Sequence, residues 1–69
     1  MVTIEVIQNA PSQDHWTDMM RSYAPKDALR LWQLAIECLD ATDCKDQDGW
    51  GRRIGIAERI LEERGIPRY

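Results

Sequence analysis

Apolar residues recur at helical spacing in three separate stretches of this chain, and this periodicity limits the fold more than any other feature of the sequence. Residues three and four apart lie on one face of a helix, so each stretch predicts one amphipathic helix. A length of 69 residues leaves room for a single small domain, residues 1–69, and no linker or internal repeat divides it.

The first stretch predicts a helix over residues 13–23. Ser12 or Asp14 can cap its start, because a short side-chain oxygen accepts from the free N–H groups of the first turn. Pro25 suits the first turn of a second helix, predicted over residues 25–41. This second helix is apolar over more than half of its circumference, so we expect it to be central to the fold.

The third stretch predicts a helix over residues 51–64, following a polar loop over 42–50. Its end is well specified, because Gly65 fits the left-handed position after a helix, Ile66 can contact Leu61 across the cap, and Pro67 blocks continuation. Asp48 is the expected cap at its start.

Residues 2–7 alternate partly and are rich in β-branched side chains, which predicts a strand with Val2, Ile4 and Val6 on one face. The expected class is therefore α+β and helix-dominated, with an N-terminal strand before three helices. One strand needs a partner for its backbone groups, either near residues 66–69 or in a second copy, so a homodimer is one expectation. The predicted core consists of Ile4, Val6, Trp16, Met20, Leu29, Trp32, Ala35, Ile36, Leu39, Ile54, Ala57, Ile60 and Leu61.

The sequence matches the ligand patterns of known metal sites poorly. A calcium loop with Gly49 at its sixth position would place Cys44 first and Gly55 twelfth, where carboxylates are needed. Cys38, Cys44 and His15 lack the paired spacing of structural zinc sites. We therefore expect no metal and no cofactor.

The sequence also disfavours catalytic activity and a position in a membrane. Nothing in the spacing of His15, Cys38 and Cys44 indicates a nucleophile pair, so we expect no enzymatic activity. The chain has no long apolar run and no N-terminal signal pattern, and two cysteines are few for a secreted scaffold. A cytoplasmic protein with reduced thiols is the expectation, although a local Cys38–Cys44 bridge stays open.

Nucleic-acid binding is a weaker alternative. The net charge is −3, which gives no general attraction to phosphates. Arg52, Arg53 and Arg59 give the third helix a modest basic face, but glutamates interleave with them. The second reading is a small regulatory or antitoxin-like module that dimerises through its strand or this helix, with DNA binding through the helix left as an open alternative.

The strongest asymmetry is an acidic run, with five carboxylates and only Lys45 to offset them between residues 37 and 48. Such a patch can meet a basic protein surface through charge complementarity. Its alternative role is that of a solvated loop with helix-capping aspartates. Trp50 can serve as an aromatic anchor beside the patch, or as the first core residue of the third helix. The candidate partner-binding residues are Glu37, Asp40, Asp43, Asp46, Asp48 and Trp50.

In size, in its acidic segment 37–48 and in its lack of catalytic motifs, the chain resembles the very small acidic phage proteins that inhibit host defence, among them the anti-CRISPR proteins. The resemblance is one of general character over the whole chain and carries no diagnostic motif. It implies a non-enzymatic inhibitor in the host cytoplasm. The implied partner is a basic, nucleic-acid-recognising surface such as that of a CRISPR effector complex, from which target DNA is then excluded.

Overall fold

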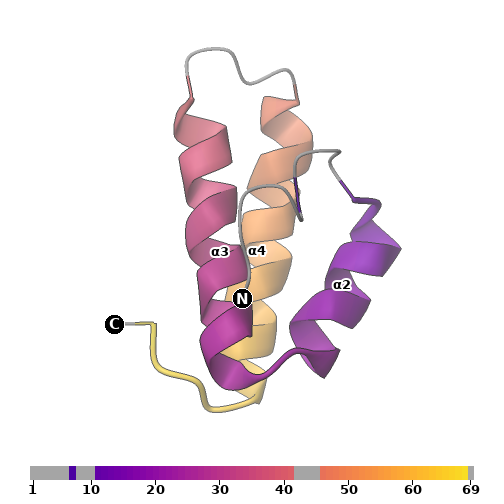
Figure 1. Cartoon of the computed structure of the whole chain (residues 1–69). Coiled ribbons are helices and arrows are strands. Elements are labelled where there is room, and N and C mark those ends of the chain that lie inside the picture. The colour runs from indigo at the N-terminus through magenta and orange to yellow at the C-terminus, as the bar shows by residue number, and fades with distance from the viewer. Residues whose placement is uncertain (1–6, 8–10, 42–45, 69) are drawn as a thin grey trace.

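Three helices make up the described part of the protein, which in this computed structural model comprises residues 7, 11–41 and 46–68. They are α2 (Gln13–Ser22), α3 (Pro25–Asp40) and α4 (Gln47–Glu63). Helices α3 and α4 run antiparallel, side by side, and α2 packs beside them with more of its contacts to α4 than to α3 (Figure 1). The helix-dominated fold expected from the sequence is thereby confirmed.

The first two helices begin where local chemistry places them. Ser12 caps α2, since its Oγ accepts from the backbone N–H of His15 at 3.1 Å. Pro25 occupies the start of α3, where its missing N–H costs nothing, after an N-cap residue, Ala24, that makes no side-chain cap bond. Both helices end within a residue or so of the predicted positions.

Helix α4 begins four residues earlier than the sequence pattern predicted. Its cap is Asp46, whose Oδ1 accepts from the backbone N–H of Gly49 at 3.1 Å. The expectation that Asp48 caps this helix is wrong, because Asp48 lies within its first turn. A Cβ at position 49 would overlap the Asp46 carboxylate, so any residue larger than glycine there would force the capping side chain to shift.

The end of α4 follows the sequence expectation. Gly65 has a φ of 69°, the left-handed conformation that glycine adopts without steric cost. Its N–H donates to the carbonyl of Glu62 at 3.0 Å, and the N–H of Ile66 donates to the carbonyl of Leu61 at 2.9 Å. These two bonds form a Schellman motif, which stops the helix and satisfies carbonyls that would otherwise lack partners.

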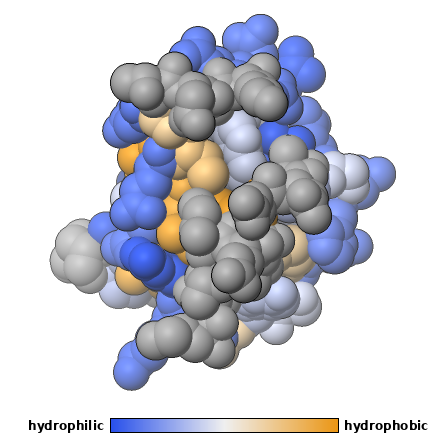
Figure 2. Space-filling model, turned by 45° about the horizontal axis from the view of Figure 1, so that its top comes forward, coloured by the Kyte–Doolittle hydropathy of each residue, from blue (hydrophilic) through white to orange (hydrophobic). Residues whose placement is uncertain are grey.

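One hydrophobic core joins the three helices. Six of the residues predicted for it are buried: Trp16, Met20, Ala35, Ala57, Ile60 and Leu61. The buried cluster also contains Ile7, Met19 and Trp50, which the predicted core omitted. In the view of Figure 2, hydrophilic residues dominate the coloured surface and hydrophobic residues show in one area between them.

The orientation of α3 differs from the prediction. Its buried face is formed by Ala28, Leu31, Leu34 and Ala35. The expected stripe is only partly buried at four positions: Leu29, Trp32, Ile36 and Leu39. Because α3 is apolar over more than half of its circumference, its periodicity allowed both faces. Packing against α2 and α4 selects between them. Ile54 of α4 is likewise only partly buried.

The predicted N-terminal strand falls almost wholly on residues 1–6, which lie outside the described residues, as do Ile4 and Val6 of the predicted core. Ile7 is described, and it is helical and fully buried. The described part of the chain contains helices and no strand, so the β component of the α+β prediction has no counterpart there. Within that same part, no helix is both long and apolar enough to cross a bilayer.

Candidate functional site

The antiparallel α3–α4 hairpin gathers four of the predicted partner-binding carboxylates at one end of the molecule. Helix α3 ends and α4 begins at the same end (Figure 1). All four side chains belong to exposed residues, and we call this set the acidic end: Glu37, Asp40, Asp46 and Asp48. Asp43, the fifth predicted carboxylate, lies outside the described residues.

Two of these carboxylates also have a role in building α4. Besides capping the helix, Asp46 places its Oδ2 at 3.5 Å from Nη1 of Arg53, with 54% of the Asp46 side chain exposed. Asp48 lies in the first turn, where a negative charge is favoured by the helix dipole. The capping role that the sequence left open for the aspartates therefore applies to Asp46, while Asp48 contributes only its charge.

Glu37 and Asp40 have no such role. They lie in the last turn of α3, a turn without a basic residue, where a negative charge opposes the helix dipole. Neither makes an ion pair with a described residue. These two exposed carboxylates therefore destabilise the helix that carries them. Their presence is not explained by a contribution to the stability of the fold.

Trp50 belongs to the core. Only 6% of it is exposed, and its ring meets that of Trp16 edge-on, with centroids 6.0 Å apart and planes at 88°. A ring buried in this way cannot serve as a surface anchor without leaving the core. Of the two roles that the sequence left open for Trp50, surface anchor and core residue, the structure supports the core residue.

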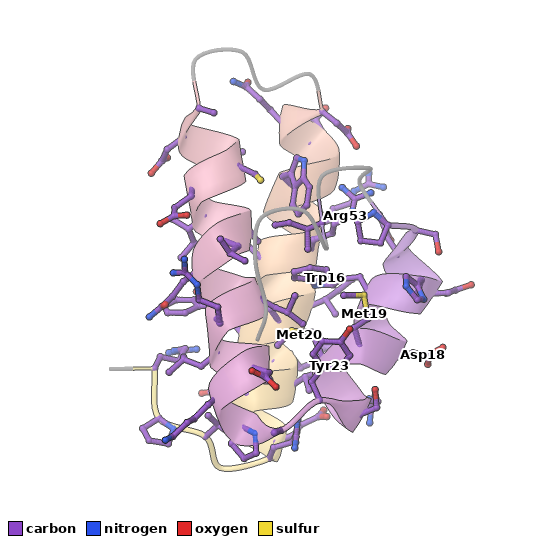
Figure 3. The ribbon with its side chains drawn as sticks, viewed as in Figure 1. Trp16, Asp18, Met19, Met20, Tyr23 and Arg53 are labelled. Carbon is purple, nitrogen blue, oxygen red and sulfur yellow. The ribbon has the colours of Figure 1, made fainter. Side chains whose placement is uncertain are left out.

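Arg53 connects α4 to the chain before α2, a contact that the sequence pattern does not predict. Its Nε donates to the carbonyl of Pro11 at 2.8 Å, and its guanidinium lies 4.7 Å from the centre of the Trp50 ring. The indole Nε1 of Trp16 donates to the backbone carbonyl of Arg53 at 2.9 Å. Figure 3 shows Arg53 and Trp16 together between α2 and α4.

The burial of Arg53 changes the basic face that the sequence indicated for the third helix. Arg53 is 6% exposed, whereas Arg52 and Arg59 are exposed. Position 53 precedes the buried Ala57 and Ile60 by four and seven residues, a spacing that places it on the core face. This spacing predicts a buried position for residue 53, whereas the charge of arginine predicts an exposed one.

Arg64 is a second arginine with a structural role that was not foreseen. Its Nη1 donates to the carbonyls of Met20 and Tyr23, each at 2.8 Å. These carbonyls lie at the end of α2, where backbone acceptors lack helical partners. Arg64 therefore holds the end of α4 against the end of α2.

The remaining candidate groups are dispersed. His15 is exposed on α2 and Cys38 is partly buried against the core, while Cys44 lies outside the described residues. Across residues 7, 11–41 and 46–68, no group of three metal-binding side chains comes together. Comparisons with family models, curated proteins and solved structures found no match to this chain.

Proposed function

We propose that this chain is a non-enzymatic, anti-CRISPR-like inhibitor that acts in the cytoplasm of a host cell. It binds a basic, nucleic-acid-recognising protein surface through the acidic end, and a CRISPR effector complex is the proposed partner. The observation that carries the proposal is the pair Glu37 and Asp40, which are exposed and unpaired within the described part and oppose the dipole of their own helix.

Charge complementarity supplies the mechanism. A partner surface that recognises nucleic acid presents Arg and Lys side chains to phosphates, and clustered carboxylates can occupy the same positions. The hairpin holds the carboxylates on two packed helices, so little conformational entropy is lost when they bind. Binding there excludes target DNA by occupying its site, which requires no catalytic group.

The second candidate is a small dimeric regulatory module that contacts DNA through α4. Arg52 and Arg59 remain exposed and favour it. Arg53 is engaged by Pro11 and Trp50, which leaves that face with two of its three expected arginines. Sedimentation equilibrium together with a DNA mobility shift at low salt tests this candidate, because it requires both a stable dimer and salt-dependent DNA binding.

A charge-reversal pair tests the proposed function. Purified CRISPR effector complexes are assayed for target-DNA binding in the presence of the wild-type chain, the Glu37→Lys/Asp40→Lys variant or a control. The control, Asp18→Lys/Glu62→Lys, makes the same change in net charge at exposed positions on α2 and α4.

We expect the wild type and the control to block DNA binding, and the acidic-end variant to lose at least roughly tenfold in potency, since charge reversal places like charges in contact. Equal loss in both variants would show that only net charge matters. Absence of inhibition by the wild type across the panel would remove the CRISPR effector as the partner.

A further inference from the structure

A groove of about 340 Å³ lies between α2 and α4, on residues that the acidic end does not include. Among the described residues, helix α2 contributes two of those that line it and α4 contributes the other four. The residues that line it are Thr17, Arg21, Gly55, Ile56, Arg59 and Ile60. The volume is within the range of pockets that bind small ligands or a few side chains of a partner.

The lining combines an apolar base with a cationic rim. Ile56 is partly buried and Ile60 is buried, while Arg21 and Arg59 are exposed. Among the described residues, no carboxylate lines the groove. Arg59 makes no ion pair with any residue the structure describes, and Arg21 makes one exposed contact, 3.6 Å, with Glu63. An exposed pair such as Arg21–Glu63 contributes little free energy, so both guanidinium groups can turn to an anionic group that enters the groove.

Gly55 keeps the groove open. It lies in the middle of α4, where glycine is a poor helix former, and a Cβ built on it meets no atom within 4 Å. The fold therefore does not require glycine here, whereas any larger side chain at this position would enter the groove.

We propose that this groove binds a segment of a partner protein in which a large apolar side chain stands next to Asp or Glu. The apolar side chain would pack on Ile56 and Ile60, and the carboxylate would pair with Arg21 and Arg59. A guanidinium binds a carboxylate through two parallel hydrogen bonds, which favours arginine at such a rim.

Nucleic acid and a second copy fit the groove less well. Phosphates gain nothing from an apolar base, and Glu58, Glu62 and Glu63 on the same helix repel a polyanion, with its many charges, more strongly than a peptide with one carboxylate. Two copies joined groove to groove would place Arg21 and Arg59 of one opposite those of the other. The proposal uses a different face from the acidic end and does not depend on the proposed function.

Selection from a random peptide display library tests the proposal, with the full chain as bait and counter-selection against its Gly55→Leu variant. Leucine fills the groove and strengthens the helix, so loss of binding in this variant does not reflect unfolding. We expect enriched peptides to carry Asp or Glu beside a large apolar residue. Their affinity for the Gly55→Leu variant should fall at least roughly tenfold.

A charge-matched pair of variants completes the test. Arg21→Glu/Arg59→Glu should weaken the selected peptides by at least roughly tenfold, while Lys26→Glu/Arg30→Glu, at exposed positions of α3, should not. The proposal is overturned if no peptide is enriched, or if the enriched peptides bind the Gly55→Leu variant equally well. Enrichment of basic peptides, or displacement of the selected peptides by duplex DNA at physiological salt, overturns it too.

Discussion

Arg53 offers the sharpest prediction about the fold, because an adjacent arginine serves as its control. We expect Arg53→Met to destabilise the protein by about 2–3 kcal/mol, and Arg52→Met to change stability by less than about 0.5 kcal/mol. Arg53 is 6% exposed, whereas Arg52, one position away on the same helix, is an exposed residue.

The magnitude follows from the contacts that methionine removes. The charged hydrogen bond from Nε to the Pro11 carbonyl contributes roughly 1.5–3 kcal/mol, and the guanidinium above Trp50 adds about 0.5–1 kcal/mol. The 3.5 Å contact with Asp46 adds about 1 kcal/mol or less, since that carboxylate is half exposed. Relief from burying the guanidinium offsets part of the total, and methionine retains the packing of the stem.

A loss of this size is large for such a small chain. At about 0.05–0.15 kcal/mol per residue, 69 residues correspond to roughly 3–10 kcal/mol of total stability. Urea denaturation followed by tryptophan fluorescence measures the change, because Trp16 and Trp50 lose their buried environment on unfolding.

Two results would refute this reasoning. If Arg52→Met lowers the urea midpoint as much as Arg53→Met, the contacts of Arg53 contribute nothing specific. If Arg53→Met raises the urea midpoint, the free-energy cost of burying the guanidinium is larger than the stabilisation that its contacts provide.

Three further predictions concern stability. Gly51→Ala and Gly55→Ala should each stabilise the protein by as much as about 1 kcal/mol. Both glycines are exposed within α4, and a Cβ at either position meets no described atom within 4 Å. Lower melting temperatures for both variants would contradict this prediction. Trp32→Phe should be neutral or stabilising by up to about 1 kcal/mol, since the buried indole N–H has no acceptor among the described residues. A clear fall in the urea midpoint would show that this N–H does have an acceptor. The Glu37→Lys/Asp40→Lys variant should gain roughly 1 kcal/mol, or several degrees in melting temperature, because cations are favoured at a helix C-terminus; a lower melting temperature would argue against the dipole effect.

Much of the helical framework could be predicted from the sequence, because its signals are local. Ser12, Pro25 and Gly65 act through their own backbone neighbours, and each is found at the helix end where its chemistry places it. The start of α4 was missed because two aspartates two residues apart both have capping chemistry. Geometry around Gly49 selects Asp46.

The arrangement of the core was less accessible, since it depends on contacts distant in the sequence. The periodicity of α3 allowed two apolar faces, and packing against the other helices selects the one with Leu31 and Leu34. The charge of Arg53 predicts a position on the surface, whereas its buried role depends on Pro11, 42 residues away. The exposed positions of Glu37 and Asp40 could be read from the sequence, whereas the groove between α2 and α4 could not.

Mapping the bound surface by NMR shows whether the partner contacts the acidic end. Amide chemical shifts of the ¹⁵N-labelled chain are recorded with and without the effector complex that it inhibits. We expect perturbations concentrated at Glu37, Asp40 and Asp48, at the acidic end. Perturbations confined to Gly55 and Arg59 in the groove, or complete absence of perturbation, would contradict the proposal that the acidic end binds the partner.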